Sequence, residues 1–142
     1  MNLPRATIVT GASNGIGEGI ARHFLERGDV VVNIDRVAPS LPDDARYRHI
    51  AADLADASST AAAIARIANE FAIDCIVNNA GTPTPGLLEE VTPAQLATGV
   101  GLSLQAPLLL AQAFVPGMKA RRFGRIVNIS SRVILGKKAR TV

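Results

Sequence analysis

The chain has 142 residues, of which 48% are hydrophobic, and it carries a net charge of +3. This length and hydrophobic content predict a single globular domain over residues 1–142 and exclude a disordered chain. We find no signal-peptide pattern, no apolar run of membrane-spanning length and only one cysteine, Cys75, so we expect a cytoplasmic protein without disulfides or a membrane segment.

A glycine-rich turn follows the first predicted strand. The apolar run 6–9 predicts a short buried strand, and the pattern over 17–27 predicts a helix. The helix carries an apolar stripe made of Ile16, Ile20, Ala21, Phe24 and Leu25. A turn between a strand and a helix leaves backbone N–H groups at the positive end of the helix dipole, which is a site for a phosphate.

Each glycine of the turn has a physical reason. Gly11 allows the tight turn, Gly15 lets the backbone approach a pyrophosphate, and Gly17 lets the helix pack closely on the strand. The spacing Thr-Gly-x-x-x-Gly-Ile-Gly resembles the short-chain dehydrogenase/reductase family. The resemblance implies an NAD(P)-dependent oxidoreductase, with the cofactor against Gly11, Ser13, Asn14, Gly15, Ile16 and Gly17.

The second predicted strand, 30–35, ends in an acidic residue, Asp35. A carboxylate about 20 residues after the glycine turn binds the adenosine ribose and repels a 2′-phosphate. We therefore predict NAD as the cofactor, with NADP less favoured, although Arg36 could pair with a phosphate. An ordinary turn carboxylate remains the alternative interpretation of Asp35.

A third strand is predicted at 46–50, and an alanine-rich helix at 58–71. The apolar stripe of this helix is predicted at Ala61, Ile64, Ala65, Ile67, Ala68 and Phe71. Between the two elements, the family resemblance implies that Asp53 accepts a hydrogen bond from the adenine amino group and that Leu54 contacts the ring. The alternative is that Asp53 only caps the next helix.

A fourth buried strand, 73–77, leads into Asn78-Asn79-Ala80-Gly81, which resembles the second signature of the family. The resemblance implies that Asn79 ties neighbouring loops together, while Ala80 and Gly81 let the cofactor lie close. The loop 82–86 is then the expected site of substrate contacts.

A long apolar helix is predicted from a capping box at Thr92 and Gln95 to about Lys119, with a bend at Pro107. In the family this helix forms part of a subunit interface, so the resemblance implies a homo-oligomer. The fifth strand, from Gly124, runs into two serines. The alternation of strands and helices predicts a doubly wound α/β fold with a parallel sheet in the order 3-2-1-4-5, truncated after the fifth strand.

The catalytic residues of the family are only partly present. Ser131 matches the family serine, with Ser130 as the alternative, and Ser103 stands where the family has an asparagine. Gly101 would match that asparagine only after a two-residue slip, which rotates the helical position by about 200°. The Tyr-x-x-x-Lys motif is absent, and the sequence ends at Val142, about where the motif is due.

The leading hypothesis is the amino-terminal part of an oxidoreductase acting on an alcohol or carbonyl. The segment 125–131 resembles the family's 3-oxoacyl-thioester reductases, in which Arg122 would dock an acyl carrier protein, unless it is an ordinary surface arginine. A non-catalytic dinucleotide-binding module or fragment is the alternative.

The acids all lie in residues 1–90, and residues 91–142 carry eight basic residues. We attribute this imbalance to acids in a missing carboxyl-terminal portion, and we predict neither nucleic-acid binding nor a metal site.

Overall fold

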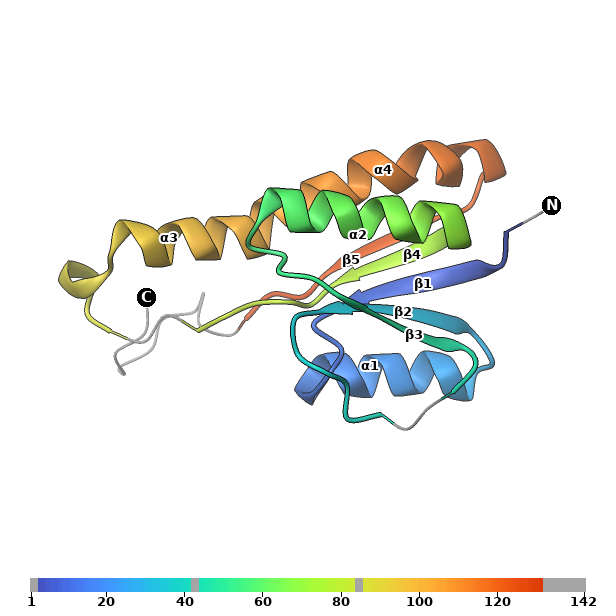
Figure 1. The fold of residues 1–142 in the computed structure, drawn as a ribbon, viewed down its shortest axis with the longest axis horizontal. Helices are drawn as coiled ribbons and strands as arrows, with labels where there is room; N and C mark the ends of the chain where they lie inside the picture. Colours follow the sequence, from blue (N-terminus) through green and yellow to red (C-terminus); the bar gives the residue numbers. More distant parts are fainter. Residues whose placement is uncertain (1–2, 42–43, 84–85, 132–142) are drawn as a thin grey trace.

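The computed structural model describes residues 3–41, 44–83 and 86–131, and it contains a five-stranded parallel sheet (Figure 1). The strands are β1 (Arg5–Thr10), β2 (Val30–Asp35), β3 (Tyr47–Ala51), β4 (Ala72–Asn78) and β5 (Arg125–Asn128). Their order is β3-β2-β1-β4-β5, and every neighbouring pair is parallel. The predicted topology is therefore confirmed.

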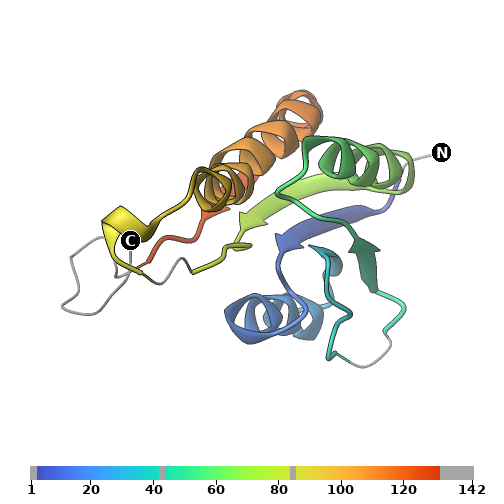
Figure 2. The ribbon, with the colours of Figure 1, turned by 60° about the vertical axis from the view of Figure 1, so that its left-hand side comes forward.

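Helices cover both faces of the sheet. Figures 1 and 2 show α1 (Gly15–Glu26) on one face and α2 (Ala57–Glu70) with α4 (Ala106–Arg121) on the other. A short 3₁₀ turn (Leu88–Glu90) precedes α3 (Pro93–Val100), which continues the line of α4 beyond the sheet. The predicted capping box is present, since Thr92 N–H donates to Gln95 Oε1 (2.8 Å) and Gln95 N–H donates to Thr92 Oγ1 (3.2 Å).

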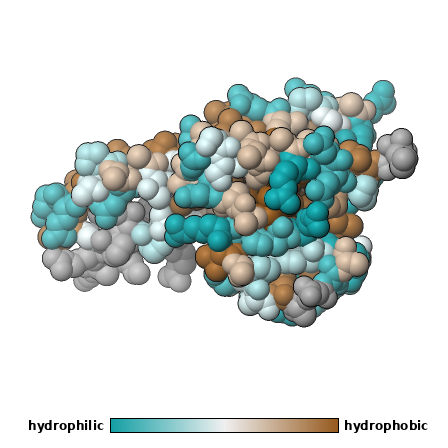
Figure 3. Space-filling model, viewed as in Figure 1, coloured by the Kyte–Doolittle hydropathy of each residue, from teal (hydrophilic) through white to brown (hydrophobic). Residues whose placement is uncertain are grey.

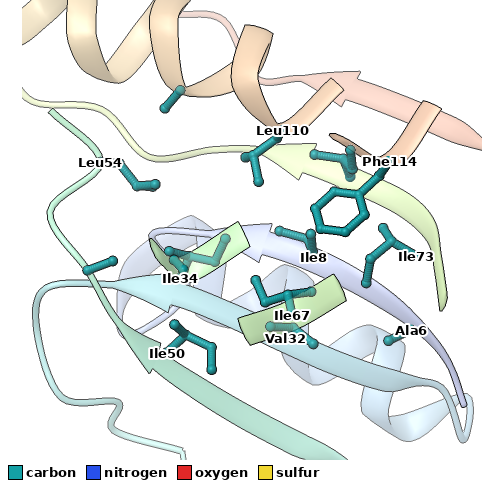
Figure 4. Close-up of a cluster of buried hydrophobic side chains, with 14 of the residues drawn as sticks. Ala6, Ile8, Val32, Ile34, Ile50, Leu54, Ile67, Ile73, Leu110 and Phe114 are labelled. Carbon is teal, nitrogen blue, oxygen red and sulfur yellow. The ribbon is translucent and has the colours of Figure 1, made fainter. Parts of the chain in front are cut away.

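The larger core lies between the sheet and the helices α2 and α4 (Figure 4). Its fully buried side chains include Ile8, Val32, Ile34, Ile50, Ile67, Ile73 and Leu110. A smaller cluster under α1 contains Val9, Ala12, Ala21, Val31, Leu41 and Val77. The strands β1 and β2 are thus buried on both faces, as central strands of a parallel sheet are.

The apolar stripes of two helices differ from the prediction. In α2 the buried residues are Thr60, Ala63 and Ile67, whereas Ala61, Ala65 and Ala68 are exposed. Ile16 is 71% exposed because α1 begins at Gly15, so Ile16 lies in the first turn, at the edge of the glycine-rich loop. Figure 3 shows hydrophilic and hydrophobic residues mixed over the face that it views.

A wide turn lies directly before Pro107, where a bend was predicted. Residues 101–105 form a π-helical turn between α3 and α4, in which the N–H of Ala106 donates to the carbonyl of Gly101. Proline lacks the N–H that an α-helix would direct to the carbonyl four residues earlier, and a π turn accommodates that loss without breaking the helix. Gly101 also packs tightly here, because a Cβ would lie 2.7 Å from the carbonyl oxygen of Ala55.

The helical stretch Pro93–Arg121 is 29 residues long and apolar enough to cross a membrane by length and composition. Core helices of soluble proteins pass the same test, so this is weak evidence. One face of the stretch packs in the main core through Ala106, Leu110, Phe114 and Met118. This packing covers one face of the stretch, whereas only 22% of its apolar 18-residue window is buried.

The cap of α2 gives a pH dependence that can be tested. Asp56 accepts hydrogen bonds from the Ser58 hydroxyl (2.5 Å) and the Ser59 N–H (2.7 Å), and these bonds lower the pKa of its carboxyl below its ordinary value. A lowered pKa in the folded state stabilises the protein above that ordinary value, and the stabilisation is lost as the pH falls through the lowered pKa.

We therefore expect Asp56→Asn, which keeps a capping oxygen but removes the charge, to flatten the acid part of the melting-temperature profile. Thermal melts of both proteins across the acid range would check this. Parallel profiles would show that the Asp56 charge contributes nothing to folding.

Candidate functional site

The carboxyl ends of β1, β2 and β4 border one cavity of about 460 Å³. Its lining includes the predicted cofactor residues Gly11, Asn14, Gly15, Ile16, Asp35, Arg36, Asp53, Leu54, Asn79, Ala80 and Gly81. Ser13 and Gly17 do not line it. The cavity also contacts Val37, Thr98 and Leu102, which the sequence did not single out, and Thr82, the first residue of the loop expected to contact substrate.

The glycine turn has the form expected of a phosphate cradle. Gly11 and Gly15 have φ of +66° and +60°, a conformation that side chains with a Cβ rarely adopt. A Cβ on Gly17 would overlap the carbonyl oxygen of Gly11 and lie 2.5 Å from Asn79 Nδ2. A Cβ on Gly15 would meet nothing within 4 Å, and Gly15 itself lines the cavity. The turn therefore fits the pyrophosphate of a dinucleotide.

Thr10 and Asn79 join the glycine turn to the end of β4. The hydroxyl oxygen of Thr10 accepts from the N–H groups of Asn79 (3.0 Å) and Ala80 (2.9 Å). In return, Asn79 Nδ2 donates to the carbonyls of Thr10 (3.0 Å) and Gly11 (3.2 Å). The role of Thr10 was missed in the sequence, although Thr10 is the first residue of the quoted glycine motif and directly follows the predicted strand.

Asp35 lies half-buried at the edge of the cavity, and its carboxylate is held by two backbone donors. One oxygen accepts from the Ser13 N–H (3.2 Å) and the other from the Val37 N–H (3.0 Å). The Ser13 side chain is buried behind the turn, where its hydroxyl donates to the carbonyl of Val37 (2.6 Å). Ser13 thus connects the glycine turn to the loop that follows β2.

Asp53 and Leu54 lie across the cavity, between β3 and α2. Asp53 Oδ1 accepts from the Ala55 N–H (2.9 Å), which forms a tight local turn. The cap of α2 is Asp56, so Asp53 does not serve as the helix cap considered for it in the sequence. Leu54 is buried yet lines the cavity.

The candidate catalytic serines lie farther along the same edge of the sheet. Ser130 and Ser131 follow β5 and are exposed, and the N–H of Ile129 before them donates to the Asn78 carbonyl (2.9 Å). Ser103 lies in the π turn and lines a separate hollow of about 450 Å³. Thr82 borders both hollows, so the second one adjoins the cofactor cavity.

No group of three or more His, Cys, Asp or Glu side chains able to hold a metal occurs among the described residues. The cavity combines backbone donors, the carboxylate of Asp35 and apolar surface. This combination suits an organic dinucleotide.

Comparison with known proteins decides the family. Residues 5–141 match the family described as short chain dehydrogenase. The chain belongs to this family. Among curated relatives, it is 37% identical to 2-(R)-hydroxypropyl-CoM dehydrogenase of Xanthobacter autotrophicus, over 91% of this chain and 57% of that protein. The chain thus spans little more than half the length of that relative.

Solved structures of short-chain dehydrogenases have the same fold. One from Streptomyces avermitilis superposes with a TM-score of 0.80 at 32% identity, over 90% of this chain and 49% of the other. A metagenomic short-chain oxidoreductase in complex with NADP gives a TM-score of 0.77 at 33% identity, over 91% and 62% of the two chains. The sequence resemblance to the family is therefore confirmed.

Proposed function

We propose that the chain is the dinucleotide-binding part of an NAD-dependent oxidoreductase, which transfers a hydride between nicotinamide and an alcohol or carbonyl substrate. The nicotinamide cofactor supplies the hydride chemistry when it is bound. The chain's own residues bind and orient that cofactor: the glycine turn holds the pyrophosphate, and Asp53 with Leu54 receives the adenine. Ser131, or Ser130 beside it, holds the substrate oxygen, and Ser103 stands in the place of the family asparagine.

The geometry of Asp35 supports the proposed preference for NAD. Its two oxygens each accept a backbone N–H, so the carboxylate cannot turn away from the cavity without losing these bonds. A fixed carboxylate accepts hydrogen bonds from a ribose hydroxyl and repels a 2′-phosphate. Arg36, exposed beside it, offsets only part of that repulsion because it lies on the surface.

The narrower proposal of a 3-oxoacyl thioester substrate rests on the resemblance of segment 125–131, and the contact with an acyl carrier protein rests on Arg122. This residue ends α4, close to where β5 begins. Because the strands are parallel, their starts lie at the opposite edge of the sheet from the cavity. An acyl carrier protein bound at Arg122 would therefore dock far from the cofactor of the same chain. This position favours a small alcohol or carbonyl as the substrate class.

We also propose a cytoplasmic homo-oligomer. Four apolar side chains, Leu96, Val100, Leu104 and Leu108, recur at every fourth residue along α3, the π turn and α4, and are 44–66% exposed. An exposed apolar stripe of this length on the outer side of a helix supports its role as a contact between subunits.

Titration of NAD and NADP tests the cofactor assignment. We expect the unmodified protein to bind NAD more tightly, and Asp35→Ser to narrow the preference by about tenfold, equivalent to about 1.4 kcal/mol. Asp29→Ser is the matched control, since Asp29 immediately precedes β2 at the opposite edge of the sheet. Tighter binding of NADP than of NAD by the unmodified protein would refute the role of Asp35.

A further inference from the structure

Tyr47, at the start of β3, directs its hydroxyl toward the glycine turn. The phenol oxygen accepts from Asn33 Nδ2 (2.9 Å), and the phenol O–H donates to the carbonyl of Ala12 (3.3 Å). The ring packs against the smaller hydrophobic cluster under α1. Tyr47 therefore has two separable parts: a ring that belongs to the core and a hydroxyl that contacts only polar groups around the turn.

Asn33 is the polar centre of this arrangement, and it is fully buried in β2. Its Oδ1 accepts from the Ala12 N–H (2.9 Å). Its Nδ2 donates one hydrogen to the Ser13 hydroxyl (2.9 Å) and the other to Tyr47. Both amide hydrogens and the amide oxygen are thus used, and a buried amide that loses one of these partners carries a desolvation penalty.

The bonds converge on the peptide that joins Ala12 to Ser13. The carbonyl of this peptide accepts from Tyr47, and its N–H donates to the carboxylate of Asp35. The same peptide unit is therefore bound on one side by the tyrosine and on the other by the ribose-binding acid. A shift of the peptide would move Asp35 and the phosphate-binding turn relative to each other.

We propose that Tyr47 is a positioning residue for the dinucleotide: with Asn33 it fixes the Ala12–Ser13 peptide and so aligns Asp35 with the glycine turn. This inference rests on the proposed function and deepens it. The hydroxyl touches no part of the cavity lining that would contact the cofactor directly. Tyr47 acts through Ala12, Ser13 and Asp35.

The protonation of Tyr47 is consistent with this role. Burial raises the pKa of the phenol, and the nearby Asp35 carboxylate raises it further, against a lowering by the Asn33 hydrogen bond. The phenol is consequently protonated at neutral pH and able to donate to Ala12.

Tyr47→Phe tests the proposal, because it keeps the ring and removes only the hydroxyl. We expect NAD affinity of the purified protein to fall about tenfold, and its preference for NAD over NADP to fall with it, since the phenol no longer fixes the Ala12–Ser13 peptide whose N–H binds Asp35. Ile50→Val, on the same strand and without polar contacts, is the matched control for a loss of stability. It is expected to lower the melting temperature without changing the preference.

A double-mutant cycle with Ser13→Ala adds a second readout. If both residues act through Asn33, the two substitutions together should weaken NAD binding by less than the sum of their separate effects. Should Tyr47→Phe fail to fold, Ser13→Ala alone is expected to reduce both affinity and preference, since it removes another partner of Asn33.

The outcomes are distinct. Unchanged NAD affinity and preference in Tyr47→Phe, with or without a lower melting temperature, would overturn the positioning role and leave the proposed function standing. Additive effects in the cycle would overturn the route through Asn33. Failure of the unmodified protein to bind NAD would overturn the proposed function, and this inference with it.

Discussion

Gly17→Ala is expected to abolish measurable dinucleotide binding. The added Cβ would overlap the carbonyl oxygen of Gly11 and crowd Asn79 Nδ2, the two groups that hold the turn against β4. Both are fixed by other hydrogen bonds, so the turn itself must move. Overpacking of this kind costs about 1–3 kcal/mol in the free energy of unfolding. A misplacement of about 1 Å costs an enzyme about 100-fold in catalysis, and a displaced turn would no longer fit the phosphates that we propose it binds.

Gly19→Ala is the matched control for this substitution. Gly19 lies in the same helix, α1, and a Cβ there meets nothing within 4 Å. Alanine at this position should stabilise the helix by about 0.5–1 kcal/mol and leave binding unchanged. Calorimetric titration with NAD and chemical denaturation of the two variants would check both results. Normal NAD binding by Gly17→Ala would mean that the turn tolerates a side chain there.

A polypeptide of residues 1–142 is expected to transfer no hydride. Its only tyrosine is Tyr47, whose hydroxyl is bound to Asn33 and Ala12 on the β2–β3 side of the sheet. None of its three lysines lies four residues after a tyrosine. General acid–base catalysis worth about 10²–10⁴-fold is therefore missing. A lysine to position the nicotinamide is missing as well, so the contribution of proximity also falls.

A cofactor-oxidation assay with a panel of alcohols and carbonyls tests this expectation. Turnover above background that disappears in Ser131→Ala would contradict it and would point to another proton donor. The same assay on a longer form carrying a Tyr-x-x-x-Lys motif separates the two functional hypotheses. Activity there supports the oxidoreductase, and its absence supports a dinucleotide-binding module.

The strand order could be predicted because the five apolar runs alternate with helical patterns, and a parallel sheet follows from that alternation. Which face of α2 is buried could not be predicted. Alanine is small enough to lie on either face of a helix, so Ala61, Ala65 and Ala68 gave no reliable direction. Thr60 is fully buried and bonds to the carbonyl of Asp56 (2.9 Å). A buried polar residue whose hydroxyl bonds within its own helix cannot be recognised from the pattern of apolar residues.

At the candidate site, the local motifs were predictable and the links between them were not. Each glycine of the turn could be placed from its neighbouring residues, and the Asn79 segment from its resemblance to the second signature of the family. The bond between Asn33 and Tyr47 depends on the pairing of β2 with β3, where Val31 lies beside Tyr47. Because this register is set by tertiary packing, the supporting role of Tyr47 emerges only from the structure.

The central place of β1 has a consequence for folding during synthesis. β1 pairs on one side with β2, the next strand in the chain, but its other edge can pair only after β4 has been synthesised. The ion pair between Arg5 and Asp74, on β1 and β4, spans 69 residues. At translation rates of roughly 5–20 residues per second, that edge stays unpaired for roughly 3–14 s. The nascent chain therefore exposes an apolar strand edge for seconds, an interval in which chaperone binding would protect it.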